Sequence, residues 1–203
     1  FAEALEAAGV PAGVLNLVTG IGPQVGPALT GHAKVKKVAF TGSTETGRRI
    51  LDAVKQDFKR VTLELGGKSP TIVMPDANLE LTIPGVANAI FFNGGQVCIA
   101  GSRLYVHNDI REQVIEGVVN YAKGLKLGHG LDQTTQMGPL VSKAHTAKVK
   151  QFVDRASAAG ANILTGGEVL GASEAFLAPT VIDQVRADME IVREEVFGPV
   201  VVA

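Results

Sequence analysis

Residues 35–67 are VKKVAFTGSTETGRRILDAVKQDFKRVTLELGG, and this stretch decides the fold class. Its two apolar runs, 35–40 and 60–65, predict strands. A helix is expected between them, because Ser43 or Thr44 can cap its first turn. A strand, a helix and a second strand joined by short connections are typical of a doubly wound parallel sheet. We therefore expect an α/β protein.

The same alternation continues on both sides of this stretch, with a change of pattern near residue 66. Further strands are predicted at 14–18, 69–74, 103–107, 162–164, 178–181 and 200–203, and helices at 1–8, 23–30, 79–92, 109–126 and 142–160. We predict two domains, 1–66 and 67–203. Because the chain begins with Phe1 and ends inside a predicted strand, we expect both domains to be truncated.

Composition excludes several classes of function. The 203 residues are 46% hydrophobic, enough to bury a core. Nineteen basic and twenty acidic residues give a net charge of −1, which offers no electrostatic surface for nucleic acid or an anionic membrane. The apolar runs are too short for a membrane-spanning helix. The four histidines lack metal-ligand spacing, so we predict no metal site. A single cysteine favours a cytoplasmic protein.

The turn that follows the first strand of the opening stretch is a candidate anion site. Thr41, Gly42, Ser43 and Thr44 lead from a strand into a helix, whose N-terminus carries unpaired N–H groups and the positive end of the helix dipole. A pyrophosphate suits such a site. The alternative is a plain capped helix, and the turn lacks the usual G-x-G-x-x-G fingerprint of dinucleotide binding.

Cys98 is a candidate nucleophile and Glu64 a candidate general base. Glu64 lies at the carboxyl end of the 60–65 strand, and ligands of open α/β sheets bind beyond the carboxyl ends of strands. A lone cysteine is often only a small buried side chain, and a glutamate at a strand end is often only solvated. The glycines at 94, 95 and 101 favour the nucleophile, since glycine lets a backbone approach a ligand closely.

Four motifs, taken together and in order, resemble those of the NAD(P)-dependent aldehyde dehydrogenase superfamily. They are residues 41–47, 63–70, 92–98 and 194–199, and the similarity extends from residue 10 to the end of the chain. The resemblance implies an aldehyde dehydrogenase-like fold. Residues 1–66 would be the C-terminal part of the dinucleotide-binding domain, a partial doubly wound parallel sheet. The rest would be the N-terminal part of an α/β catalytic domain.

The resemblance also implies a mechanism and a set of site residues. Cys98 would attack the aldehyde and form a thiohemiacetal, which becomes a thioester after hydride transfer to NAD or NADP. Glu64 would activate the water that releases the carboxylic acid, and the Cys98 N–H would help to hold the oxyanion. Glu195 would bind the nicotinamide-side ribose and Phe197 would pack near the nicotinamide. The cofactor-binding residues would be Gly42, Ser43, Thr46, Leu65, Glu195 and Phe197.

Two residues near Cys98 differ from the family pattern in ways that concern the substrate. Two features typical of family members are not found in this sequence. Gly94 stands where relatives often have a bulkier residue, and with Ile99 it favours a hydrophobic, aryl-substituted aldehyde. The family's oxyanion asparagine and oligomerisation strand lie outside this chain, so we expect it to have little turnover alone. The parent is expected to be a homodimer or homotetramer. Two alternatives stay open: transfer of the acyl group to coenzyme A, and a catalytically silent structural or binding protein.

Overall fold

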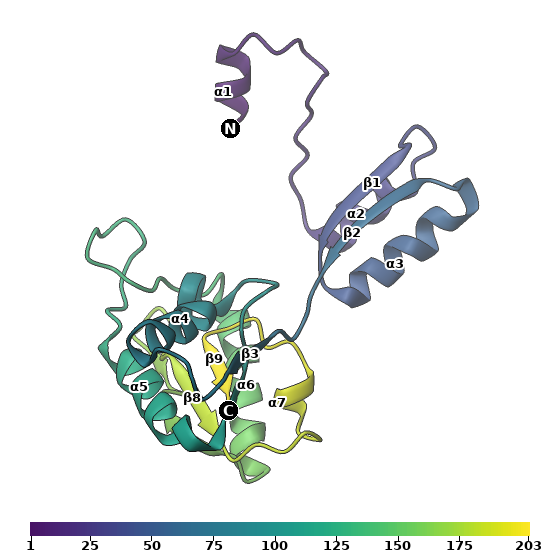
Figure 1. Cartoon of the computed structure of the whole chain (residues 1–203). Coiled ribbons are helices and arrows are strands. Elements are labelled where there is room, and N and C mark those ends of the chain that lie inside the picture. The colour runs from purple at the N-terminus through teal and green to yellow at the C-terminus, as the bar shows by residue number, and fades with distance from the viewer. The chain divides into compact units, whose positions relative to one another are not determined.

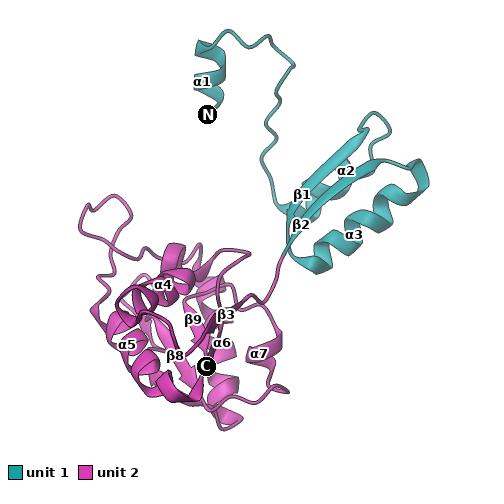
Figure 2. Ribbon diagram, in the orientation of Figure 1, with its two compact units in different colours: residues 1–65 teal, residues 66–203 magenta.

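The computed structural model describes residues 1–203, and the chain divides into unit 1, residues 1–65, and unit 2, residues 66–203 (Figures 1 and 2). The predicted domain boundary between residues 66 and 67, and the role of each domain, stay predictions. No helix is both long enough and apolar enough to span a bilayer.

Unit 1 is built around a parallel β-α-β arrangement. Its elements are α1 (Ala2–Ala7), α2 (Gly22–Thr30), β1 (Lys37–Gly42), α3 (Thr44–Val54), a 3-10 turn (Lys55–Asp57) and β2 (Arg60–Leu65). β1 pairs with β2 in parallel, with Phe40 beside Leu63. α3 connects the two strands and buries Gly47, Ile50 and Val54. The crossover predicted from residues 35–67 is therefore present.

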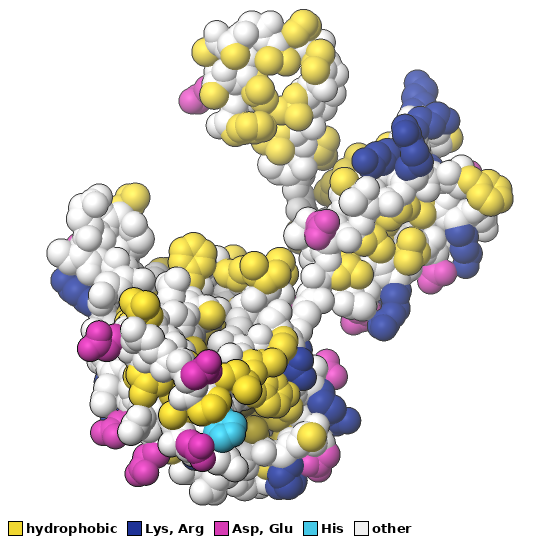
Figure 3. Space-filling model, viewed as in Figure 1, with side chains coloured by type: hydrophobic (Ala, Val, Ile, Leu, Met, Phe, Trp, Pro, Cys, Tyr) yellow, Lys and Arg dark blue, Asp and Glu magenta, His cyan; other side chains and the backbone are white.

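The strand predicted at residues 14–18 is wrong. This segment has no strand partner among residues 1–203, and Val14, Leu15, Leu17 and Val18 are between 51% and 75% exposed. A strand exists only where a neighbouring strand supplies its hydrogen bonds, whatever its β propensity. The N-terminal segment of unit 1 consequently shows many exposed apolar side chains (Figure 3).

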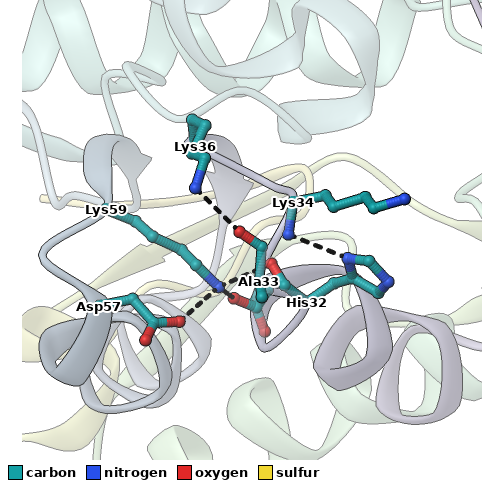
Figure 4. Close-up of polar contacts among 7 residues, drawn as sticks. His32, Ala33, Lys34, Lys36, Asp57 and Lys59 are labelled. Carbon is teal, nitrogen blue, oxygen red and sulfur yellow. Dashed lines mark hydrogen bonds and ion pairs between the residues drawn. The ribbon is translucent and has the colours of Figure 1, made fainter.

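A buried lysine ammonium ties the end of α2 to the start of β2 (Figure 4). The Lys59 side chain is only 2% exposed, and its Nζ donates to the carbonyl oxygens of Thr30 at 2.7 Å and His32 at 3.0 Å. An ion pair of 3.2 Å joins the same Nζ to Asp57. The last carbonyl groups of a helix lack partners within it, so Lys59 supplies a donor to the Thr30 carbonyl oxygen that ends α2. The His32 carbonyl oxygen, beyond the helix, also accepts from the Val35 N–H at 3.0 Å.

Unit 2 contains a five-stranded mixed sheet in the order β3-β4-β9-β8-β5. All neighbouring strands are parallel except β5 and β8, which are antiparallel. The strands are β3 (Pro70–Val73), β4 (Arg103–Val106), β5 (Asn162–Thr165), β8 (Thr180–Asp183) and β9 (Val200–Val202), and the helices are α4 (Leu79–Phe91), α5 (Arg111–Gly124), α6 (Lys143–Ala158) and α7 (Glu190–Arg193). The hairpin of β6 (Val169–Leu170) and β7 (Phe176–Leu177), and the short α7, were not predicted.

The core of unit 2 has two layers, one on each face of this sheet. Val181 and Val201 pack with buried residues of α4 and α5, such as Ile90 and Val118. Their strand neighbours Ile182, Val200 and Val202 pack instead with Val149, Phe152 and Val153 of α6. Successive strand side chains point to opposite faces, so a strand such as β9, which is apolar and buried at every position, must be covered on both sides. Unit 2 is therefore an α/β/α sandwich.

Candidate active site

The first turn of α3 has the features of an anion site. Ser43 is the N-cap: its Oγ accepts from the Thr46 N–H at 3.2 Å and lies 2.9 Å from the Thr46 hydroxyl oxygen. The Gly47 N–H is bonded to the Ser43 carbonyl oxygen at 3.0 Å. The N–H groups of Thr44 and Glu45 precede the first intrahelical bond, so they remain able to donate to a ligand.

Glu64 and Leu65 end β2 beside the end of β1. Thr41 is opposite Glu64, and Gly42 is opposite Leu65 in the parallel register. Glu64 is exposed at this carboxyl edge. Leu65 lies under α3, since a Cβ at Gly47 would come within 2.8 Å of its Cδ2. A Cβ at Gly42 would likewise meet the Phe40 ring at 2.5 Å. Packing therefore favours glycine both in the predicted anion turn, at residue 42, and within α3, at residue 47.

Cys98 lies on an exposed turn that follows a sharp reversal of the chain. The reversal uses Asn93, Gly94 and Gly95, which have φ values of +52°, +61° and +70°. The left-handed region costs little for glycine and asparagine, so these residue types allow the turn. The Asn93 Nδ2 donates to the Gln96 carbonyl oxygen at 3.2 Å, so its amide is used within the loop.

Gln96, which the sequence analysis did not select, anchors the loop that carries Cys98. Its Nε2 donates to the Asn93 carbonyl oxygen at 3.1 Å, and its Oε1 accepts from the Val141 N–H at 2.9 Å. The second bond spans 45 residues and ties the loop to the segment before α6. No local pattern in the sequence signals a contact of this kind.

Close backbone approaches bring three segments of unit 2 together around the cysteine loop. A Cβ at Gly66 would lie 2.0 Å from the Glu195 Oε2, and the Gly67 N–H donates to the Glu195 Oε1 at 3.4 Å. A Cβ at Gly95 would lie 2.0 Å from the Gly198 carbonyl oxygen. Residues 66–67, the loop up to Cys98 and residues 195–198 therefore pack together only because these positions lack side chains.

Phe197 has an unusual backbone conformation and a histidine partner that sequence reasoning missed. Its φ is +56°, in the region that residues other than glycine seldom adopt. The Nε2 of His145 lies 2.7 Å from the Phe197 carbonyl oxygen, and the two rings meet edge to face with centroids 6.0 Å apart. The contact joins residues 52 apart in the chain, so no motif could have revealed it.

Lys68, directly after the two glycines, is a buried cation without a hydrogen-bond partner. The pKa of Lys68 is lowered from 10.5 to about 8, chiefly by burial and then by the charge of Arg103, while Glu195 and Glu194 act in the opposite direction. Arg103 has a buried Nε that also lacks a partner. Charged groups this poorly satisfied are concentrated at functional sites.

The predicted site residues fall into two groups. Cys98, Glu195 and Phe197 belong to unit 2. Glu195 and Phe197 line one small pocket with Gly67 and Ser102, and Cys98 follows Val97, which also lines it. Those in unit 1 lie at the carboxyl edge of its sheet or in the first turn of α3; they are Gly42, Ser43, Thr46, Glu64 and Leu65. No cluster of three or more histidine, cysteine or acidic side chains suited to a metal ion is found in residues 1–203.

Comparison with known proteins gives one consistent result. The model of the aldehyde dehydrogenase family matches residues 1–203. The chain belongs to the aldehyde dehydrogenase family. It is 48% identical over 204 residues to phenylacetaldehyde dehydrogenase of Pseudomonas fluorescens, covering 100% of this chain and 41% of that protein. This family member therefore spans about two-fifths of the length of its curated relatives.

Solved aldehyde dehydrogenases confirm the predicted fold class. A mutant of the Bacillus cereus enzyme matches with a TM-score of 0.97 and 46% identity, over 99% of this chain and 41% of that one. Betaine aldehyde dehydrogenase from Staphylococcus aureus, solved in complex with NAD+, matches with a TM-score of 0.93 and 41% identity, over 98% of this chain and 41% of that one. The aldehyde dehydrogenase-like α/β fold predicted from the four motifs is thus confirmed.

Proposed function

We propose that the protein oxidises an aldehyde to a carboxylic acid with NAD or NADP, through a covalent intermediate on Cys98. The observation that carries this proposal is the placement of the chain's only thiol. Cys98 is exposed on a turn beside Gly67, and its loop packs against the segment that holds Glu195 and Phe197. Membership of the aldehyde dehydrogenase family supports the same assignment.

The proposed reaction has two halves, which share the sulfur atom. In the first, the Cys98 thiolate forms a C–S bond with the aldehyde carbon, giving a thiohemiacetal whose oxyanion accepts from the Cys98 N–H. Loss of a hydride from that carbon leaves a thioester. In the second half, Glu64 takes a proton from water, the water oxygen attacks the thioester, and the C–S bond breaks to release the acid and the thiolate.

The residues present suit a nicotinamide dinucleotide, which when bound supplies the acceptor for the hydride. The N-terminus of α3 offers N–H groups and hydroxyl groups of Ser43 and Thr46 for its phosphates and adenosine portion, with Gly42 and Leu65 alongside. The Glu195 carboxylate suits a ribose diol, because its two oxygens can accept from two hydroxyls. Phe197 offers an apolar ring, 38% exposed, for the nicotinamide.

The substrate we propose is a hydrophobic, aryl-substituted aldehyde. Ile99, the residue after the nucleophile, is 76% exposed and can contact an apolar substrate. The similarity to a phenylacetaldehyde dehydrogenase points to the same class. A cytoplasmic location suits a mechanism that needs a reduced thiol, and assembly of the full-length protein as a homodimer or homotetramer is part of the proposal.

The test is to measure turnover of a panel of aldehydes by the full-length protein with NAD or NADP. Turnover is monitored as the formation of reduced cofactor. Cys98→Ser is expected to lower kcat by more than about a thousandfold, since the hydroxyl is a far weaker nucleophile than the thiolate. Glu64→Gln is expected to leave a burst of reduced cofactor and to slow the following turnover by about 10²- to 10⁴-fold. Turnover that survives Cys98→Ser would rule the mechanism out.

The same assay separates the two alternatives. Formation of acyl-CoA in place of acid when coenzyme A is added would favour the acylating reaction, for which Glu64 is not needed as a base. A silent binding protein would show neither product, and its Cys98 would fail to react faster with an aldehyde-like alkylating reagent than with a simple one. The isolated 203-residue chain is expected to show little or no turnover in this assay.

A further inference from the structure

His145 contacts the segment that carries Phe197 through both its ring nitrogen and its ring edge. The 2.7 Å contact joins its Nε2 to the Phe197 carbonyl oxygen, which can only accept. The proton must therefore be on Nε2, and both the neutral tautomer that carries it and the imidazolium form make this bond. The ring of His145 meets the Phe197 ring at an interplanar angle of 68°.

The Phe197 backbone needs such support. A phenylalanine with φ of +56° is in a conformation that costs free energy and persists only where the surroundings impose it. The next residue, Gly198, lies directly against α6, since a Cβ there would come within 2.6 Å of the Val149 Cγ1. The first turns of α6 thus hold residues 197 and 198 from one side.

His145 is itself fixed by the start of α6. Ser142 is the N-cap of this helix, and its Oγ accepts from the His145 N–H at 3.1 Å. The Thr146 hydroxyl, which is fully buried, donates to the Ser142 carbonyl oxygen at 3.1 Å. A capped first turn with a buried neighbour gives the histidine backbone a defined position. The ring therefore reaches Phe197 from a rigid element.

We propose that His145 is a positioning residue that holds Phe197, and with it Glu195 two residues earlier, in the conformation that receives the nicotinamide end of the cofactor. The proposal rests on the proposed function for the role of Phe197 and Glu195. The hydrogen bond itself is independent of that role, so the two claims can be tested separately. The predicted consequence is on cofactor binding more than on the chemistry at Cys98.

Two substitutions in the full-length protein separate the hydrogen bond from the ring contact. His145→Phe keeps an aromatic ring against Phe197 and removes the donor, whereas His145→Gln keeps an Nε2 donor at a similar reach. The matched control is His129→Phe, because His129 is exposed and its ring accepts only from the local Leu131 N–H. The measurements are KM for NAD or NADP, KM for the aldehyde, the melting temperature, and amide hydrogen exchange of residues 194–199.

We expect His145→Phe to raise the KM for the cofactor about three- to tenfold, the range that corresponds to one lost hydrogen bond. The KM for the aldehyde should stay within about twofold, since His145 does not touch Cys98. Exchange of residues 194–199 should become faster, and neither it nor the melting temperature should change in His129→Phe. In His145→Gln the KM for the cofactor should lie close to the wild-type value, because the donor is kept. A purely structural loss would raise it in both variants.

Two results would overturn the proposal. One is a wild-type cofactor KM and wild-type exchange in His145→Phe. The other is a raised cofactor KM with unchanged exchange of residues 194–199, which would mean that His145 contacts the cofactor itself. If the full-length protein oxidised no aldehyde, the proposed function would fail, whereas faster exchange in His145→Phe and its reversal in His145→Gln would still establish the support of Phe197.

Discussion

The end of α2 in unit 1 and the first residues of unit 2 both bury a lysine ammonium, but they satisfy it differently. Lys59 has two carbonyl oxygens and the Asp57 carboxylate within 3.2 Å of its Nζ. Lys68 has a buried Nζ with no hydrogen-bond partner and the guanidinium charge of Arg103 nearby. A buried charge is tolerated when it is paired and is costly when it is not. The first lysine stabilises the fold, and the second lowers stability next to the candidate active site.

The largest effect is expected when Lys59, the lysine whose ammonium group has hydrogen-bond partners, is replaced. Lys59→Met would remove the side-chain donor to the Thr30 carbonyl oxygen at the end of α2 and one of the two donors to the His32 carbonyl oxygen. We expect the free energy of unfolding of unit 1 to fall by about 3 kcal/mol, because the lost bonds are charge-assisted and buried. Urea unfolding of the full-length protein, with hydrogen exchange of α2 to locate the loss, measures it.

The control for this variant is Lys36→Met. The Lys36 Nζ donates to a single carbonyl oxygen, that of Ala33 at 3.1 Å, at an exposed position. We expect a change within about 0.5 kcal/mol for it, as for most surface substitutions. A loss in Lys59→Met no larger than that of the control would break the contrast between the two lysines.

The buried ammonium group of Lys68, which lacks a hydrogen-bond partner, should make the free energy of unfolding depend on pH. The pKa of Lys68 is about 8 in the folded protein and near its ordinary 10.5 after unfolding. Between these two values the unfolded state binds the extra proton, so the stability rises as the pH rises through that range. The full difference corresponds to at most roughly 3 kcal/mol, and we expect a rise of about 2 kcal/mol. Below pH 8 both states are charged and the penalty is present in full.

Comparison with Lys68→Met isolates this contribution from other groups that titrate at high pH. The variant should lack the rise between pH 8 and 10.5, and at neutral pH it should be at least as stable as the wild type, since methionine fills similar volume without a charge. An equal rise in both proteins would show that Lys68 carries no unfavourable charge. The unfolding free energy, measured by urea at each pH, gives the result.

Sequence pattern predicted the elements that depend on their own residues. β2 was placed at its observed bounds, because apolar residues alternate along Arg60–Leu65. α4 was predicted across Pro84, and the helix continues through this proline, its sixth residue, because its apolar spacing lets it pack against the core. The strand at 14–18 failed for the opposite reason: its apolar residues are suited to a strand, but no neighbouring strand pairs with them.

In the candidate site too, the sequence predicts residues whose role is local and misses those whose role depends on distant partners. Cys98 could be selected as a lone thiol among glycines, which let a backbone approach a ligand closely. The structure uses two of these glycines, Gly94 and Gly95, at positive φ in the chain reversal. The roles of Gln96 and His145 depend on partners 45 and 52 residues away, and no local pattern encodes such a partner. Nor could the sequence distinguish Lys59 from Lys68, since burial and partners of a lysine are set by tertiary packing.

Asp57→Asn separates the contribution of the Asp57–Lys59 ion pair from that of the hydrogen bonds between Lys59 and the two carbonyl oxygens. Asp57 has a side chain that is 53% exposed, so its ion pair with Lys59 is partly screened by water. We expect its loss to lower the free energy of unfolding by at most about 1 kcal/mol, well below the effect of Lys59→Met. Urea unfolding at low and high salt should show a difference that shrinks as salt is added. A loss as large as that of Lys59→Met would assign the stabilisation to the ion pair, and the Thr30 and His32 carbonyl oxygens would then not be what separates Lys59 from Lys68.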